Sequence, residues 1–174
     1  FHDEITRLGG NPLLWKTGHS HLKTKLAEMQ APLAGEMSAH IFFKHRYYGY
    51  DDAIYSAIRL LSFLCSTDET LAQIRDALPD YVNTPEIRFE CAEDRKFEVI
   101  EEVRSRLIDG EGYTVNDIDG VRVENQDGWW LLRASNTQAA LVARCEGINE
   151  DSLTLVKKVL ASELKKSGIE PPEF

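Results

Sequence analysis

The apolar residues of this chain recur three or four positions apart in several segments, which predicts amphipathic helices with an apolar stripe facing a core. These segments are residues 20–29, 51–65, 66–78, 97–110 and 150–166. Ser20 suits the N-cap of the first, and Ser66 with Glu69 has the form of a capping box for the third. The stripe of the second is expected to face inward and consists of Ile54, Ala57, Ile58, Leu61 and Cys65.

Short apolar or alternating runs between these segments predict strands. Residues 12–15 follow a Gly-Gly-Asn turn signal and predict a short buried strand. The stretch 33–43 is expected to be extended, and its residues 35–40 would then place alternate side chains on one face. Strands are also predicted at 87–91, at two or three places between 113 and 132, with Asp127-Gly128 as a hairpin signal, and at 141–145.

Residues 79–85 contain two prolines and separate two different patterns. Before this linker, in residues 1–78, short strands alternate with helices, as in an α/β fold. After it, residues 86–174 predict the order β-α-β-β-β-α, an α+β domain with an antiparallel sheet and two helices. The expected organisation is therefore two domains joined by the linker 79–85.

The chain has 174 residues and a formal net charge of −9, which argues against a general nucleic-acid binder with a basic stripe. No apolar run approaches the ~20 residues of a membrane span, so no membrane partner is expected. The three cysteines lack a CxxC pair, and this favours a reduced, cytoplasmic protein. Because the chain starts at Phe1 without Met, it is either processed or a piece of something longer.

One candidate site follows from the stretch 35–40. If this backbone is extended, Glu36, Ser38 and His40 share a face. A carboxylate accepts hydrogen bonds from two neighbouring hydroxyls, a serine donates or accepts, and a histidine moves protons near neutral pH. This set could bind a polyhydroxylated small molecule. The alternative is a polar edge where a loop enters a buried strand.

A second candidate site is the run Arg133-Ala134-Ser135-Asn136-Thr137 between two predicted strands. The guanidinium of Arg133 matches phosphate geometry, and short hydroxyl or amide side chains and a backbone nest would add donors. The alternative is ordinary turn chemistry, for which Ser-Asn-Thr is equally suited. Four histidines (His19, His21, His40, His45) raise the question of a metal, but no cysteine or carboxylate has supporting spacing, so no metal site is expected.

Three motifs, taken in order, resemble the α-D-phosphohexomutase superfamily, and most closely its bacterial phosphomannomutase/phosphoglucomutase branch. They are Lys16-Thr17-Gly18-His19-Ser20, Gly35-Glu36-Met37-Ser38-Ala39-His40 and Arg133-Ala134-Ser135-Asn136-Thr137. The resemblance continues through Phe42-Phe43-Lys44, Gly49-Tyr50-Asp51-Asp52, Tyr55-Ser56-Ala57 and Thr84-Pro85-Glu86. One departure is Ala39, which stands where the branch usually has glycine.

The resemblance implies a four-domain isomerase that moves a phosphoryl group between positions 1 and 6 of a hexose through a hexose 1,6-bisphosphate intermediate. In that family a phosphoserine on domain 1 transfers the group, and an Asp-rich loop on domain 2 holds Mg²⁺. Neither motif occurs here, so residues 1–78 would be the end of domain 3 and residues 86–174 domain 4. The chain alone would be inactive, and its partners would be hexose phosphates and the missing N-terminal domains.

The resemblance also assigns roles to single residues. Glu36 and Ser38, with Met37 between them, would bind sugar hydroxyls, as would the loop of Gly18 and His19. His40 would be a general acid/base near the reacting oxygen. The phosphate that does not react would be bound by Arg133, Ala134, Ser135, Asn136 and Thr137. The alternative function is a standalone sugar-phosphate or anion-binding module without catalysis.

Overall fold

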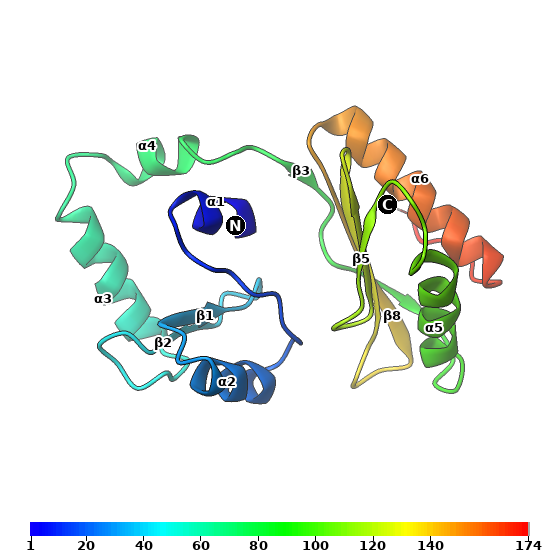
Figure 1. Ribbon diagram of the computed structural model, residues 1–174, viewed down its shortest axis with the longest axis horizontal. Coiled ribbons are helices and arrows are strands. Elements are labelled where there is room, and N and C mark those ends of the chain that lie inside the picture. The colour runs from blue at the N-terminus through cyan, green and yellow to red at the C-terminus, as the bar shows by residue number, and fades with distance from the viewer. Residues whose placement is uncertain (174) are drawn as a thin grey trace. The chain divides into compact units, whose positions relative to one another are not determined.

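A computed structural model of the chain describes residues 1–173 (Figure 1). The chain divides into two compact units, Phe1–Leu78 and a second unit from Pro79 onward. The first contains four short helices and one hairpin, and the second contains a sheet with two helices. No helix among residues 1–173 combines the length and the apolar character needed to cross a bilayer.

The first unit is built around a small hairpin. Its elements are α1 (His2–Arg7), α2 (His19–Glu28), β1 (Leu33–Gly35), β2 (Ile41–Phe43), α3 (Ala53–Leu64) and α4 (Leu71–Asp76). Strands β1 and β2 pair antiparallel, with Ala34 opposite Phe42. Helix α2 contacts β1, and α3 contacts β2. Phe42 is fully buried and Leu26 of α2 nearly so, and they are the two buried apolar residues of this unit.

The prediction of extended backbone through residues 35–40 is wrong. Strand β1 ends at Gly35, and the chain reverses before β2. The Glu36 N–H donates to the His40 carbonyl at 2.9 Å, and the Ala39 N–H donates to the Glu36 carbonyl at 3.0 Å. Ala39 has φ +67°, a left-handed conformation that a turn requires and that an alternating pattern does not reveal. The polar side chains of this stretch therefore lie on a hairpin turn.

The predicted strand at residues 12–15 is also wrong, because this segment has no regular structure. Leu13 and Leu14 are about half exposed. Pro12 has no N–H to donate to a ladder, and no strand among residues 1–173 pairs with the segment.

The helices predicted for the first unit after residue 18 are present, but the residues that cap some of them differ from the prediction. Helix α2 begins at His19 after the N-cap Gly18, rather than after Ser20. Asp52 caps α3 by accepting from the Tyr55 N–H. The capping box of α4 is formed by Thr70 and Gln73. Ser66, predicted for that role, instead donates its hydroxyl to the Phe63 carbonyl.

The apolar stripe of α3 does not face a core. Ile54, Ile58 and Leu61 are 77%, 57% and 60% exposed, and α3 has no buried residue. Helix α4 likewise has none. The helical period therefore marks an apolar face correctly, but nothing among residues 1–173 covers it.

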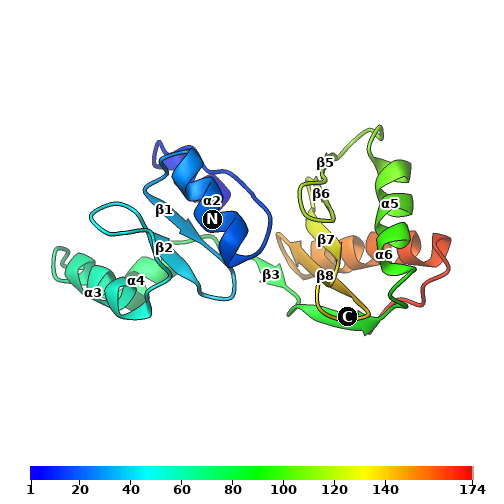
Figure 2. The same ribbon diagram turned by 90° about the horizontal axis from the view of Figure 1, so that it is seen from below.

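The second unit is an antiparallel sheet, as predicted (Figure 2). Its elements are β3 (Val82–Asn83), β4 (Ile87–Glu90), α5 (Lys96–Leu107), β5 (Thr114–Asn116), β6 (Val121–Asn125), β7 (Gly128–Ala134), β8 (Ala140–Gly147) and α6 (Glu150–Lys166). The order along the sheet is β3-β8-β7-β6-β5, and β4 also pairs with β8. The two or three strands predicted between residues 113 and 132 are three, β5 to β7, which is one more than the order β-α-β-β-β-α contains. Strand β3 lies in the segment expected to be a linker.

Both helices cover the same face of this sheet (Figure 1). Alternate residues of β6, β7 and β8 point into the core, among them Val121, Leu132 and Leu141. Helix α6 contributes Leu160 and Leu164, which are fully buried. Because side chains alternate along a strand, Arg133 lies on the opposite face from Leu132, away from the helices.

Candidate functional site

The turn of the β1–β2 hairpin and the start of α2 are joined by one short hydrogen bond. The Gly18 N–H donates to Glu36 Oε1 at 2.6 Å. Ser38 Oγ lies 3.4 Å from the other oxygen, Oε2. Gly18 is the N-cap of α2 and has φ +125°, a conformation that favours glycine. The positive end of the helix dipole faces a carboxylate here, a favourable electrostatic contact. Two of the sequence motifs are thus brought together through Glu36.

Asp51 brings two histidines together beside this carboxylate. Its Oδ2 lies 2.7 Å from His40 Nδ1 and 3.4 Å from His19 Nε2, and its Oδ1 accepts from the Ile41 N–H at 3.2 Å. The two imidazole rings meet edge to face with centroids 4.4 Å apart. The His19 ring also lies edge-on to the buried ring of Phe42 at 5.2 Å.

The carboxylate of Asp51 is held in its charged form by its neighbours. Desolvation raises the pKa of Asp51, but the hydrogen bonds from His40 and the Ile41 N–H and the charges of both histidines outweigh it, so the pKa lies below its ordinary value. An ionised carboxylate only accepts. His40 Nδ1 is therefore the donor in this contact, and Nε2 is the second ring nitrogen, the one that could transfer a proton or bind a ligand.

The sugar-site residues predicted from the sequence therefore divide into a cluster and one neighbour, Met37. Glu36, Ser38, His40, His19 and Gly18 come together at the hairpin turn. Met37 lies on the same turn with its side chain 65% exposed. Such a cluster offers a carboxylate acceptor, a hydroxyl and a proton-transferring ring within one small surface.

Three of these side chains are also potential metal ligands. One ligand atom each of His19, Glu36 and His40 lie within 4.8 Å of one another. The sequence predicted no metal site because the carboxylate partner is far along the chain from His19. The fold supplies that partner by bringing α2 against the hairpin.

The second predicted site lies at the end of β7. Arg133 and Ala134 are the last residues of β7, and Ser135 begins the loop to β8. Ser135 is buried, and its hydroxyl accepts from the N–H groups of Thr137 and Gln138 at 3.4 and 3.2 Å. Its side chain therefore shapes the turn, in agreement with the turn-chemistry alternative. Asn136 and Thr137 are exposed and leave their side chains available to a ligand.

Arg133 shares a carboxylate with a second arginine. Its guanidinium lies 3.7 Å from Glu86 Oε2, and Arg88 donates to Glu86 Oε1 at 2.7 Å. Only 14% of the Arg133 side chain is exposed. Because Arg88, Val142 and Arg133 are aligned across β4, β8 and β7, both guanidinium groups stand on the helix-free face of the sheet, with one acid between them.

Lys96 of α5 holds this loop, a role that the sequence did not reveal. It is 1% exposed at the start of α5. Its ammonium donates to the carbonyls of Ser135 and Gln138 at 2.7 and 3.0 Å and lies 2.7 Å from Glu93 Oε1. A lysine in the first turn of a helix looks like a surface residue, and nothing in the local pattern signals that it holds a loop 39 residues further along.

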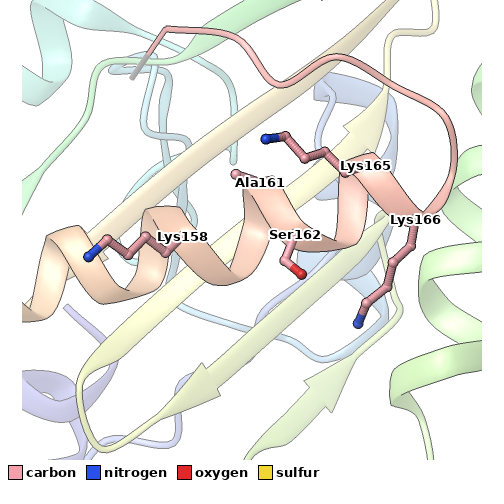
Figure 3. A pocket seen from close by; sticks show the side chains of 5 residues that line it. All are labelled: Lys158, Ala161, Ser162, Lys165 and Lys166. Carbon is pink, nitrogen blue, oxygen red and sulfur yellow. The ribbon is translucent and has the colours of Figure 1, made fainter.

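A shallow depression elsewhere lies on α6. It is lined by Lys158, Ala161, Ser162, Lys165 and Lys166 (Figure 3). All of these residues belong to one helix, and Lys166 pairs with Glu163 at 2.5 Å. This surface contains none of the predicted site residues.

Comparison with known proteins identifies the family of this chain. Residues 1–81 match the model of the phosphoglucomutase/phosphomannomutase alpha/beta/alpha domain III, and residues 86–163 match the C-terminal domain of the same family. These two matches cover most of the chain, which therefore belongs to the phosphoglucomutase/phosphomannomutase family.

Individual relatives agree with this assignment. The chain is 46% identical over 161 residues to a phosphomannomutase/phosphoglucomutase of Pseudomonas aeruginosa. The matched region covers 92% of the chain and 35% of that protein. It is 40% identical over 155 residues to a phosphoglucomutase of Neisseria gonorrhoeae, covering 88% of the chain and 33% of that protein. A phosphoglucomutase/phosphomannomutase family protein of Burkholderia thailandensis has a similar structure, with a TM-score of 0.83 and 40% identity, covering 94% of this chain and 34% of the other. The chain thus spans about a third of the length of these relatives.

Replacing Lys96 by methionine should loosen the Arg133 loop. The variant keeps most of the apolar stem but leaves the carbonyls of Ser135 and Gln138 without their donor. We expect the unfolding free energy of the second unit to fall by about 1–3 kcal/mol, measured by urea denaturation, with faster amide exchange in residues 135–139. Lys158→Met, on the exposed side of α6, is the control. Equal effects of the two substitutions would contradict the role of Lys96.

The contact between Asp51 and His40 should be visible in a titration. Because the folded pKa of Asp51 is lowered, its ionised form stabilises the folded state fully above the ordinary aspartate pKa. That contribution is lost as pH falls through the lowered value. Carboxyl ¹³C NMR should place the Asp51 midpoint below 3.8, and His40→Ala should raise it. A midpoint that His40→Ala leaves unchanged would show that the contact is absent in solution.

Proposed function

We propose that this chain is the C-terminal part of a phosphohexomutase that interconverts hexose 1-phosphates and 6-phosphates through a hexose 1,6-bisphosphate. The observation that carries the proposal is the convergence of Glu36, Ser38, His40 and His19 at one turn of a chain from this family. Residues 1–78 would belong to domain 3 and residues 86–174 to domain 4, with residues 79–85 joining them. The chain would supply binding groups, and the phosphoserine and metal loops would lie in other domains of the parent enzyme.

The hairpin cluster suits the sugar. Glu36 is held by the Gly18 N–H through one oxygen, and its second oxygen and the Ser38 hydroxyl can accept from and donate to neighbouring sugar hydroxyls. A carboxylate that is already oriented loses little conformational freedom when it binds. Two poses of one hexose present similar hydroxyls, so the same pair can serve both phosphoryl transfers.

His40 is proposed as the general acid/base. With Nδ1–H donated to Asp51, Nε2 can accept the proton of the sugar hydroxyl as its oxygen bonds to phosphorus and the phosphoserine oxygen leaves. In the reverse transfer the same nitrogen returns the proton to the leaving sugar oxygen. Asp51 would stabilise the imidazolium formed between these steps.

The Arg133 loop is proposed to hold the phosphate that does not react. Arg133 supplies a charge-assisted donor pair. The exposed Asn136 and Thr137 supply further donors beside Ala134 and the buried Ser135. A phosphate would compete with Glu86 for the Arg133 guanidinium, which lies 3.7 Å from that carboxylate. Binding energy gained at this remote group can be used to position the reacting end.

Mg²⁺ is expected in the parent enzyme and not at the hairpin cluster. This ion takes oxygen ligands in an octahedral arrangement, whereas two of the three clustered ligand side chains are imidazoles. No step proposed for the residues of this chain involves Mg²⁺. The parent enzyme is expected to be cytoplasmic, in keeping with three cysteines that form no disulfide.

The proposal is tested by comparing the chain with its full-length parent. The purified parent, with Mg²⁺ and a trace of glucose 1,6-bisphosphate, should convert glucose 1-phosphate or mannose 1-phosphate to the 6-phosphate. The 174-residue chain should show no turnover under the same conditions. An inactive parent that still binds hexose phosphates would favour the alternative, a sugar-phosphate-binding module.

Within the parent enzyme, Arg133→Ala should weaken use of the substrate. Loss of a charge-assisted hydrogen bond of about 1.5–3 kcal/mol corresponds to a fall in kcat/KM of about ten- to a hundredfold, carried mainly by a higher KM. Arg104→Ala is the matched control, because Arg104 lies on α5 and pairs with Glu101 of the same helix and with Asp117 after β5. If Arg133→Ala and Arg104→Ala have the same kinetics, the phosphate role of Arg133 is refuted.

A further inference from the structure

We propose that His19, Glu36 and His40 form a binding site for Zn²⁺ or a chemically similar transition-metal ion. Their three ligand atoms lie within 4.8 Å of one another. An ion at the centre of a triangle with that side would be no more than about 2.8 Å from each atom, and zinc bonds to nitrogen and oxygen are about 2.0–2.2 Å. Small side-chain rotations close this difference.

The surroundings of these side chains resemble the outer shell of a metal site. Asp51 Oδ2 lies 2.7 Å from His40 Nδ1 and 3.4 Å from His19 Nε2, so one carboxylate orients both rings, as an outer-shell carboxylate does in a metal site. The Gly18 N–H holds Glu36 Oε1 at 2.6 Å, which leaves the Oε2 atom for coordination. The ligands are therefore already oriented, so less ordering is needed when an ion binds.

The donor set selects the class of ion. Two imidazoles and one carboxylate are typical ligands of zinc, with water in the fourth position, and Co²⁺ accepts the same set. Ions that prefer oxygen alone, such as Mg²⁺ and Ca²⁺, are disfavoured. The side chains of His19 and His40 are 46% and 43% exposed, so an ion from solution can reach them.

A consequence of this site rests on the proposed function. The metal would occupy Glu36 and His40, the same groups that bind and deprotonate the sugar. Zn²⁺ would therefore act as an inhibitor that raises the KM for hexose phosphate when Mg²⁺ is saturating. Binding of the metal itself does not depend on the proposed function.

The test uses the 174-residue chain without an affinity tag, in a Cys65→Ser, His2→Ala background. These two changes remove an exposed thiol and the chelating pair formed by His2 and the terminal amine. Calorimetric titration with ZnCl₂ at pH 7 should show one equivalent bound, and Co²⁺ should give the intense visible absorption of a four-coordinate site.

Variants identify the ligands. His40→Ala and Glu36→Gln should each weaken Zn²⁺ binding at least tenfold, and Asp51→Asn should weaken it about 10–100-fold through the orientation of His40. His21→Ala is the matched control, an exposed histidine on the same helix as His19, and should have no effect. Circular dichroism of each variant checks that the fold is retained.

The proposal is overturned by absence of Zn²⁺ binding, by binding that His40→Ala leaves unchanged, or by an equal loss in His21→Ala. The mutase assay of the parent enzyme tests the proposed function independently of zinc binding. If the chain binds zinc as predicted but the parent enzyme has no mutase activity, the metal site stands and the proposed function fails. If the parent is active and the chain binds no zinc, the reverse holds.

Discussion

The hydrogen bond from the Gly18 N–H to the Glu36 carboxylate is the constraint on which the candidate sugar site depends. It joins the start of α2 to the turn of the hairpin at 2.6 Å, so two motifs that are 18 residues apart act as one surface. Asp51 completes the arrangement by contacting both histidines. Beneath these polar groups lies the buried ring of Phe42, against which His19 packs. The candidate site is therefore a hairpin turn held by hydrogen bonds to Glu36 and Asp51 and packed on one buried aromatic ring.

In the second unit, the apolar pattern of a helix correctly predicted which residues are buried, because the sheet that covers them belongs to the same chain. The apolar period over residues 150–166 predicted α6, and Leu160 and Leu164 do enter the core. The first unit shows the limit. The period of Ile54, Ile58 and Leu61 marked an apolar face just as clearly, but these side chains are exposed. Periodicity reports which side of a helix is apolar, and not whether the chain contains what covers it.

The sequence could name the residues of the candidate sites, but it could not predict how those residues are arranged in space. Glu36, Ser38 and His40 were expected to share a strand face, but a reversal with Ala39 at positive φ brings them together instead. Ala39 occupies a position where glycine would fit this backbone without strain. Long-range partners leave no local signal. Lys96 reads as a surface lysine, and Asp51 reads as a helix-capping residue beside Asp52, which is the true N-cap.

The central claim is that the hairpin cluster binds the sugar and the Arg133 loop binds the phosphate of a hexose phosphate. The most direct measurement is a crystal structure of the full-length parent enzyme with glucose 1-phosphate bound. We expect hydrogen bonds from sugar hydroxyls to Glu36 and Ser38, and a phosphate within hydrogen-bond distance of the Arg133 guanidinium. A substrate bound without contact to Glu36, or a phosphate held away from Arg133, would contradict it.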